Sequence, residues 1–114
     1  MKKPDKELLS DMLQHCLDIL DFTKETQTIE MFEVDKKTFN ASILSLLHIG
    51  EIAKDISLQL KASQPHIKWH QLTGLRNRLA HDYHGVEMTM IWRVIKKNIP
   101  EFIEEIRKLL NSLN

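Results

Sequence analysis

The longest periodic stretch of the chain is residues 35–62, DKKTFNASILSLLHIGEIAKDISLQLKA, in which apolar side chains return every three or four positions. This spacing places them on one face of a helix. Asp35 can cap that helix through its carboxylate, so we expect one helix from Asp35 to about Ala62. Gly50 and Ala53 stand on the apolar face where bulk is usual, and we expect another helix to cross closely there. The inward positions are Phe39, Ile43, Leu46, Leu47, Gly50, Ala53, Ile56 and Leu60.

An amphipathic helix precedes this stretch. Pro4 suits a first helical turn, and Asp5 and Glu7 stabilise the positive end of the helix dipole. The segment from Thr26 to Val34 breaks the periodicity. The apolar stripe of the first helix comprises Leu9, Met12, Leu13, Cys16, Leu17, Ile19 and Leu20.

Three further helical segments follow the central one. Ser63-Gln64-Pro65 ends the central helix, and a shorter helix then carries Trp69, Leu72, Leu75, Arg76 and Leu79, with Gly85 near its exit. The next helix begins near Glu87, and Pro100 is expected to break or kink it. The stripe of this helix comprises Met88, Ile91, Trp92 and Ile95, and that of the last helix comprises Phe102, Ile106, Leu109 and Leu113.

These stripes, joined by short connections, predict an all-α fold, an antiparallel bundle of four to five helices. The chain has 114 residues and no linker rich in Pro, Gly or Ser, so we expect a single domain over residues 1–114. Apolar residues make up 42% of the chain and charged residues 28%, which excludes the intrinsically disordered class.

Composition also bears on the compartment. No apolar run approaches the roughly eighteen residues of a membrane span, and no apolar region of a signal peptide follows the basic N-terminus. Cys16 is the only cysteine and stands among leucines, so we expect a buried free thiol rather than an intrachain disulfide. A cytoplasmic protein fits these features best.

The charges are balanced overall but not locally. Sixteen basic and sixteen acidic residues cancel, which argues against a protein that coats nucleic acid through bulk charge. Two readings of the local excess stay open at this point, a cationic binding patch and a solvated basic face. Between residues 61 and 84 the charged residues and histidines are Lys61, Lys68, Arg76, Arg78, Asp82, His66, His70, His81 and His84.

The segment most suited to chemistry is Arg76-Asn77-Arg78-Leu79-Ala80-His81-Asp82-Tyr83. Arg76 and His81 are five positions apart, about 140° around an ideal helix, so they do not share a face. If both serve one site, the helix ends or distorts near Ala80, or two copies of the helix meet. Asn77 and His81 are four apart and do share a face, so the Asn77 amide can orient the imidazole.

This segment resembles the R-x-x-x-x-H-x-Y signature of the HepT-like branch of HEPN domains, the toxin half of a two-gene toxin–antitoxin module. Its surroundings are also similar to that family, over about residues 35–110. The matching features are Ile49-Gly50-Glu51, Trp69 seven residues before Arg76, Gly74-Leu75 directly before the arginine, and Trp92 with Pro100 downstream.

The resemblance implies a HEPN-like bundle that dimerises so that the Arg-and-His helices of two subunits face each other across a cleft. It also implies a metal-independent endoribonuclease, in which the ribose 2′-hydroxyl attacks the neighbouring phosphate. His81 can take or deliver a proton near neutral pH. Arg76 keeps its charge and can hold phosphate oxygens in the transition state. No metal or cofactor is expected.

The resemblance further implies a control point and a partner. In this family the tyrosine matching Tyr83 receives AMP from a nucleotidyltransferase antitoxin, and an anion there would fill the cleft and pair with Arg76. Asn77 and Arg78 are candidate RNA-contacting or supporting residues. Glu51 either approaches the cleft from the central helix or is simply exposed.

Other interpretations of the same residues stay open. Related bundles act as non-catalytic substrate-binding subunits of nucleotidyltransferases, and the basic segment of a purely structural bundle could close a dimer interface. Two histidine pairs, His66 with His70 and His81 with His84, could hold zinc, although no cysteine joins them. The two tryptophans could stack on bases, or belong to the core or the dimer interface.

Overall fold

The computed structural model describes residues 3–82 and 87–113 of the chain. Over these residues the secondary structure is helical, with no strand, so the predicted all-α class is confirmed. The elements in chain order are α1 (Asp5–Phe22), α2 (Ile29–Val34), α3 (Lys36–Asp55), α4 (Leu58–Ser63), α5 (Trp69–Asp82), α6 (Met88–Arg93), the π-helical segment η2 (Val94–Asn98) and α7 (Ile99–Ser112).

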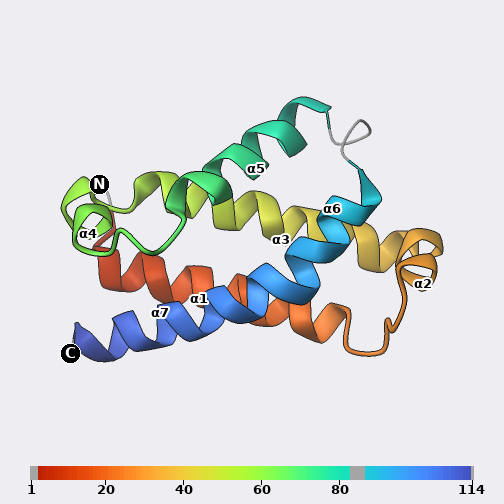
Figure 1. Ribbon diagram of the computed structural model, residues 1–114, viewed down its shortest axis with the longest axis horizontal. Helices are drawn as coiled ribbons and strands as arrows, with labels where there is room; N and C mark the ends of the chain where they lie inside the picture. Colours follow the sequence, from red (N-terminus) through yellow and green to blue (C-terminus); the bar gives the residue numbers. More distant parts are fainter. Residues whose placement is uncertain (1–2, 83–86, 114) are drawn as a thin grey trace.

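The long helices alternate in direction, as an antiparallel bundle requires (Figure 1). α1 and α3 lie side by side, and α5 packs on α3 at an angle. α6, η2 and α7 form one continuous helical run that returns along the bundle to pack beside α1. No helix in the described ranges is both long enough and apolar enough to cross a membrane.

The core is built from the stripes that the sequence predicts. Cys16 is buried as expected, and burial raises the pKa of its thiol to about 12. Trp69 is buried with its ring edge-on to Phe102, and Trp92 is half-buried against Phe32, so both tryptophans pack within the bundle. Leu113, expected on the last stripe, lies beyond the end of α7 and is exposed. The largest fully buried side chains are Phe32, Leu9, Met12, Ile19, Leu46, Ile49, Ile56, Leu79, Ile91, Ile95, Ile99 and Ile106.

The central helix is shorter than expected. α3 ends at Asp55 rather than near Ala62, Ile56 is extended, and Ser57 caps the separate helix α4 by accepting from the Leu60 N–H. The carboxylate of Asp5, on α1, accepts the Ser57 N–H at 2.9 Å and the Ser57 hydroxyl at 2.6 Å. These two hydrogen bonds satisfy the donors of Ser57 at the point where the backbone leaves the helix. Asp5 is 52 residues away from Ser57 in sequence, so the local apolar pattern does not predict this end of the helix.

The segment that breaks the periodicity contains a short helix, α2. Thr28 caps it by accepting the Met31 N–H, and Phe32 supplies its single buried side chain, packed against Phe39 and Trp92. A helix of 6 residues with one inward residue shows no stripe, which is why the periodicity misses it.

Pro100 does not break the C-terminal helical run. It stands at the start of α7, and the backbone of the flanking residues keeps right-handed helical angles. The preceding turn widens into the π-helical segment η2. A proline inside an α-helix clashes with the carbonyl four residues earlier, and a wider turn moves that carbonyl away. The expected break is therefore replaced by a local widening.

Candidate active site

The candidate catalytic helix, α5, is held against α3 by an unusually close crossing. A Cβ on Gly50 would overlap the Cβ of Arg76 and would lie 2.8 Å from the carbonyl oxygen of Leu72. Only glycine leaves room for the two backbones at this point. The close crossing predicted from Gly50 is confirmed, and the residue that occupies the space is Arg76 itself.

Arg76 is anchored at this crossing by its guanidinium. Its Nε lies 3.0 Å from Oε2 of Glu51, on α3, and its Nη1 donates to Oδ1 of Asn77 at 3.1 Å. The side chain of Arg76 is 29% exposed and that of Glu51 45%, so the ion pair borders solvent. Arginine has five N–H donors, and these two contacts leave others for an incoming phosphate.

His81 occupies the last turn of α5 and is exposed. The helix runs without interruption from Trp69 to Asp82, so the distortion near Ala80 that would bring Arg76 and His81 onto one face is absent from this part of the chain. Five helical positions put their side chains about 140° apart around α5. Within one copy of the described helix, Arg76 and His81 therefore lie on different sides of α5.

The other predicted site residues fall in different places. Glu51 does approach Arg76 from α3. Asn77 is exposed and its amide oxygen accepts from Arg76, while its role toward His81 stays a prediction. Arg78 is exposed and lines a groove on the other side of α5. Tyr83, like His84 and Gly85, lies outside the described residues.

No group of three or more metal-binding side chains comes together within residues 3–82 and 87–113. His66 and His70 are both exposed. His66 lines a groove between the start of α5 and α7, together with Lys68, Glu101 and Glu105.

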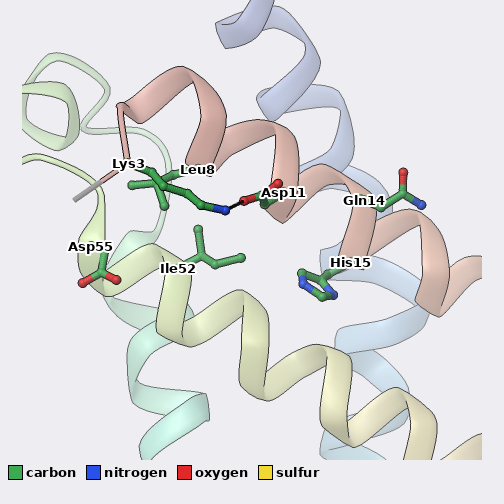
Figure 2. A pocket seen from close by; sticks show the side chains of 7 residues that line it. All are labelled: Lys3, Leu8, Asp11, Gln14, His15, Ile52 and Asp55. Atoms are coloured by element: carbon green, nitrogen blue, oxygen red, sulfur yellow. Dashed lines mark hydrogen bonds and ion pairs between the residues drawn. The ribbon is translucent and has the colours of Figure 1, made fainter. Parts of the chain in front are cut away.

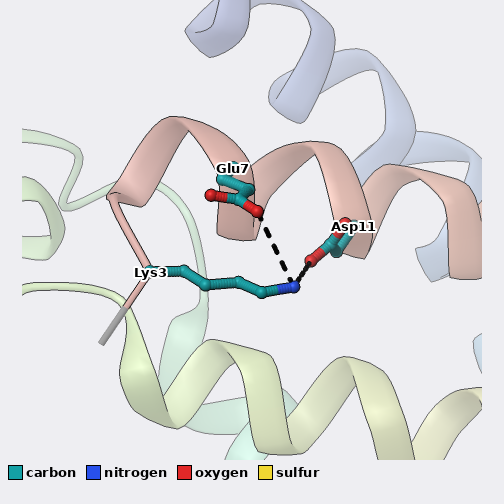
Figure 3. A network of polar contacts seen from close by, with 3 residues as sticks. All are labelled: Lys3, Glu7 and Asp11. Atoms are coloured by element: carbon teal, nitrogen blue, oxygen red, sulfur yellow. Dashed lines mark hydrogen bonds and ion pairs between the residues drawn. The ribbon is translucent and has the colours of Figure 1, made fainter. Parts of the chain in front are cut away.

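A second groove, between α1 and α3, has a volume of about 500 Å³ and is lined from those two helices and the segment before α1 (Figure 2). Lys3 spans it: its Nζ lies 2.9 Å from Asp11 and 3.9 Å from Glu7 (Figure 3). The hydrogen bond that Lys3 donates to the Asp11 carboxylate raises the pKa of Lys3. Lys3 and Asp11 thus pair with each other, and the described residues that line this groove come from outside α5.

Two histidines stack near this groove. The rings of His15 and His48 lie 4.9 Å apart, nearly parallel. Partial burial, and then the neighbouring His48, lower the pKa of His15, so the neutral form is favoured. The pair therefore fits helix packing between α1 and α3 better than proton transfer to a ligand.

Comparisons with known proteins identify the family of this chain. The model of the HepT-like family, described as Ribonuclease HepT-like, matches residues 12–109. The chain belongs to the HepT-like ribonuclease family. This confirms the resemblance on which the assignment of Arg76 and His81 rests, although the match itself names no catalytic residue.

Two relatives illustrate the similarity. The protein named "Probable ribonuclease HepT" from Thermococcus cleftensis is 36% identical over 109 residues, covering 96% of this chain and 98% of its own. The protein named "Putative RNase MJ0127" from Methanocaldococcus jannaschii is 34% identical over 112 residues, covering 98% of this chain and 92% of its own. No solved structure gives a significant match.

Sequence reasoning missed the groove beside α5 that Arg78 lines. Gln71, Leu75 and Arg78 follow helical spacing on α5, and Met90, Val94 and Asn98 follow it on α6 and η2. The helical spacing of each trio can be recognised in the sequence. The two trios face each other because of the way α6 packs against α5, and the spacing within one helix does not predict that packing.

Proposed function

We propose that this protein is a metal-independent endoribonuclease whose site combines Arg76 and His81 from two copies of the chain. The observation that carries the proposal is the family match over residues 12–109, in a chain that has both residues on one exposed helix. The names of the two relatives describe ribonucleases, in agreement with RNA as the substrate.

The proposed reaction uses the 2′-hydroxyl of the RNA as nucleophile. The His81 imidazole accepts the proton of the 2′-hydroxyl while the 2′-oxygen attacks the adjacent phosphorus. The bond from phosphorus to the 5′-oxygen of the next nucleotide breaks, and that oxygen takes a proton from solvent water. The products are a 2′,3′-cyclic phosphate and a 5′-hydroxyl. Arg76 donates to the phosphate oxygens, where negative charge builds in the transition state.

The proposed site is shared between two subunits of a dimer. Arg76 points toward α3 and pairs with Glu51, while the exposed His81 projects from another side of α5. A two-fold axis near the exposed side of α5 would place the His81 of one copy opposite the Arg76 of the other. Glu51 then has a positioning role, since its carboxylate holds Arg76 at the edge of the shared cleft.

Metal removal provides the first test. The wild-type protein is expected to cut single-stranded RNA at an unchanged rate in excess EDTA and to leave cyclic phosphate ends, which mass spectrometry of the products identifies. The His81→Ala protein, purified identically, controls for contaminating nucleases. Loss of cleavage in EDTA with recovery in Mg²⁺ would contradict the proposal. RNA binding without cleavage by any form would favour a non-catalytic substrate-binding subunit instead.

The proposal extends to regulation within a two-gene module acting in the cytoplasm. A nucleotidyltransferase antitoxin would attach AMP to Tyr83, two residues beyond His81, and the added phosphate would compete with RNA for Arg76. Incubation with that partner and ATP is expected to raise the mass of the wild-type chain by one AMP and to leave Tyr83→Phe unchanged. An equal mass increase on both chains would rule out Tyr83 as the acceptor.

A further inference from the structure

The groove between α5 and the α6–η2 run has a volume of about 320 Å³, within the range of small-molecule sites. It is open to solvent along one side of α5, next to the exposed turn that carries His81. The lining side chains that matter here are Gln71, Leu75, Arg78, Met90, Val94 and Asn98.

The chemistry of the groove suits a nucleobase. Leu75, Met90 and Val94 form apolar walls, against which a flat ring can lie. Gln71 and Asn98 carry amides, each with two donors and one acceptor oxygen, which is the combination that reads the edge of a base.

The charge of the groove suits the phosphate of the same nucleotide. Arg78 is exposed at this groove, and among the described residues no carboxylate lines it. The adjoining groove, which shares Gln71 and Asn98, differs because Glu101 and Glu105 line it together with Lys68 and His66. The two carboxylates repel an RNA backbone and offset the charge of Lys68, so a nucleotide is favoured in the first groove.

The groove leads toward His81. Arg78 precedes His81 by three residues, so their positions differ by roughly 4.5 Å along the helix axis and by about 60° around it. A phosphate held by Arg78 would thus lie beside the imidazole that the proposed function places at the reacting bond.

Gly74 keeps this approach open. It also lines the groove, on the side of α5 toward His81. A Cβ there would meet nothing within 4 Å, so no contact inside the chain requires a glycine. Glycine in a helix costs about 1 kcal/mol relative to alanine, and its use here fits close approach of a ligand to the helix backbone.

We propose that this groove binds the base of one nucleotide flanking the bond that is cut, and that Gln71 and Asn98 set which base is preferred. The inference rests on the proposed ribonuclease function and adds the subsite that gives it sequence preference. The amides are specificity residues and take no part in proton transfer.

The test separates binding from cleavage. Full-length His81→Ala protein, labelled with ¹⁵N, is titrated with each of the four ribonucleoside 5′-monophosphates, and the side-chain amide signals of Gln71 and Asn98 are followed by NMR. We expect these signals to move with at least one nucleotide, and Asn98→Leu to weaken its binding about tenfold. The matched control is Asn111→Leu, on the exposed last turn of α7. Inorganic phosphate alone should leave the amide signals in place.

In cleavage assays on a mixed-sequence RNA, Gln71→Leu and Asn98→Leu are expected to lose base preference at the cut by about tenfold, while Asn111→Leu retains it. Nucleotide-induced shifts without cleavage by the wild-type protein would support the groove and overturn the ribonuclease function. Cleavage with the same preference in all three variants would overturn the groove proposal. Amide signals that move with protein concentration, and not with nucleotide, would overturn it too, because a second copy then covers the groove.

Discussion

Mixing the Arg76→Ala and His81→Ala proteins is expected to restore about a quarter of the wild-type rate of RNA cleavage. Each variant alone is expected to be slower by about 10²- to 10⁴-fold, the usual loss when a proton-transfer group or a phosphate-binding donor is removed. In a mixed dimer one site keeps the intact Arg76 of one chain and the intact His81 of the other. Half of the dimers are mixed, and each carries one working site of two.

The measurement needs free exchange of subunits, which co-expression with two different affinity tags provides. Sequential purification on both tags isolates the mixed dimer, whose rate is compared with those of the two parent variants. Parent proteins combined without exchange serve as the control and should stay inactive. An isolated mixed dimer as slow as its parents would show that Arg76 and His81 of different chains do not form a working site.

Replacing Gly50 by alanine is expected to destabilise the protein by about 2 kcal/mol. Alanine improves helix propensity by up to about 1 kcal/mol, but overpacking a tight contact costs typically 1–3 kcal/mol or more. Here the new methyl group would meet the Cβ of Arg76 and the backbone oxygen of Leu72, and neither can turn aside as a flexible side-chain end could. The whole of α5 must therefore shift away from α3.

The free energy of unfolding measured in urea tests this, with Gly74→Ala as the matched control. A methyl group at Gly74 has no neighbour within 4 Å, so this variant is expected to be more stable by about 0.5–1 kcal/mol through helix propensity alone. Equal stability of the two alanine variants would contradict the close crossing. Gly50→Ala should also slow RNA cleavage, because the shift of α5 separates Arg76 from Glu51.

Local sequence patterns predicted most of the bundle. The stripes on residues 9–20 and 39–60 identify buried faces that the structure confirms, since the side chain of an amphipathic helix must face either core or water whatever its neighbours are. Gly50 on such a face predicted a helix crossing, because the cost of a buried glycine needs a steric reason. The five-residue spacing of Arg76 and His81 already excluded a shared face on a regular helix.

Features that depend on contacts between residues far apart in the sequence were decided by the tertiary structure. Asp5 ends α3 through Ser57, 52 residues later, and Phe32 makes a helix of a segment without a stripe by packing against Phe39 and Trp92. The groove of Gln71 and Asn98 likewise exists only because α6 packs against α5. The sequence by itself determined which face of each long helix is buried, since that depends on residues three and four apart. Helix ends, the short helix and the groove depend on contacts between distant residues, which only the packed bundle brings together.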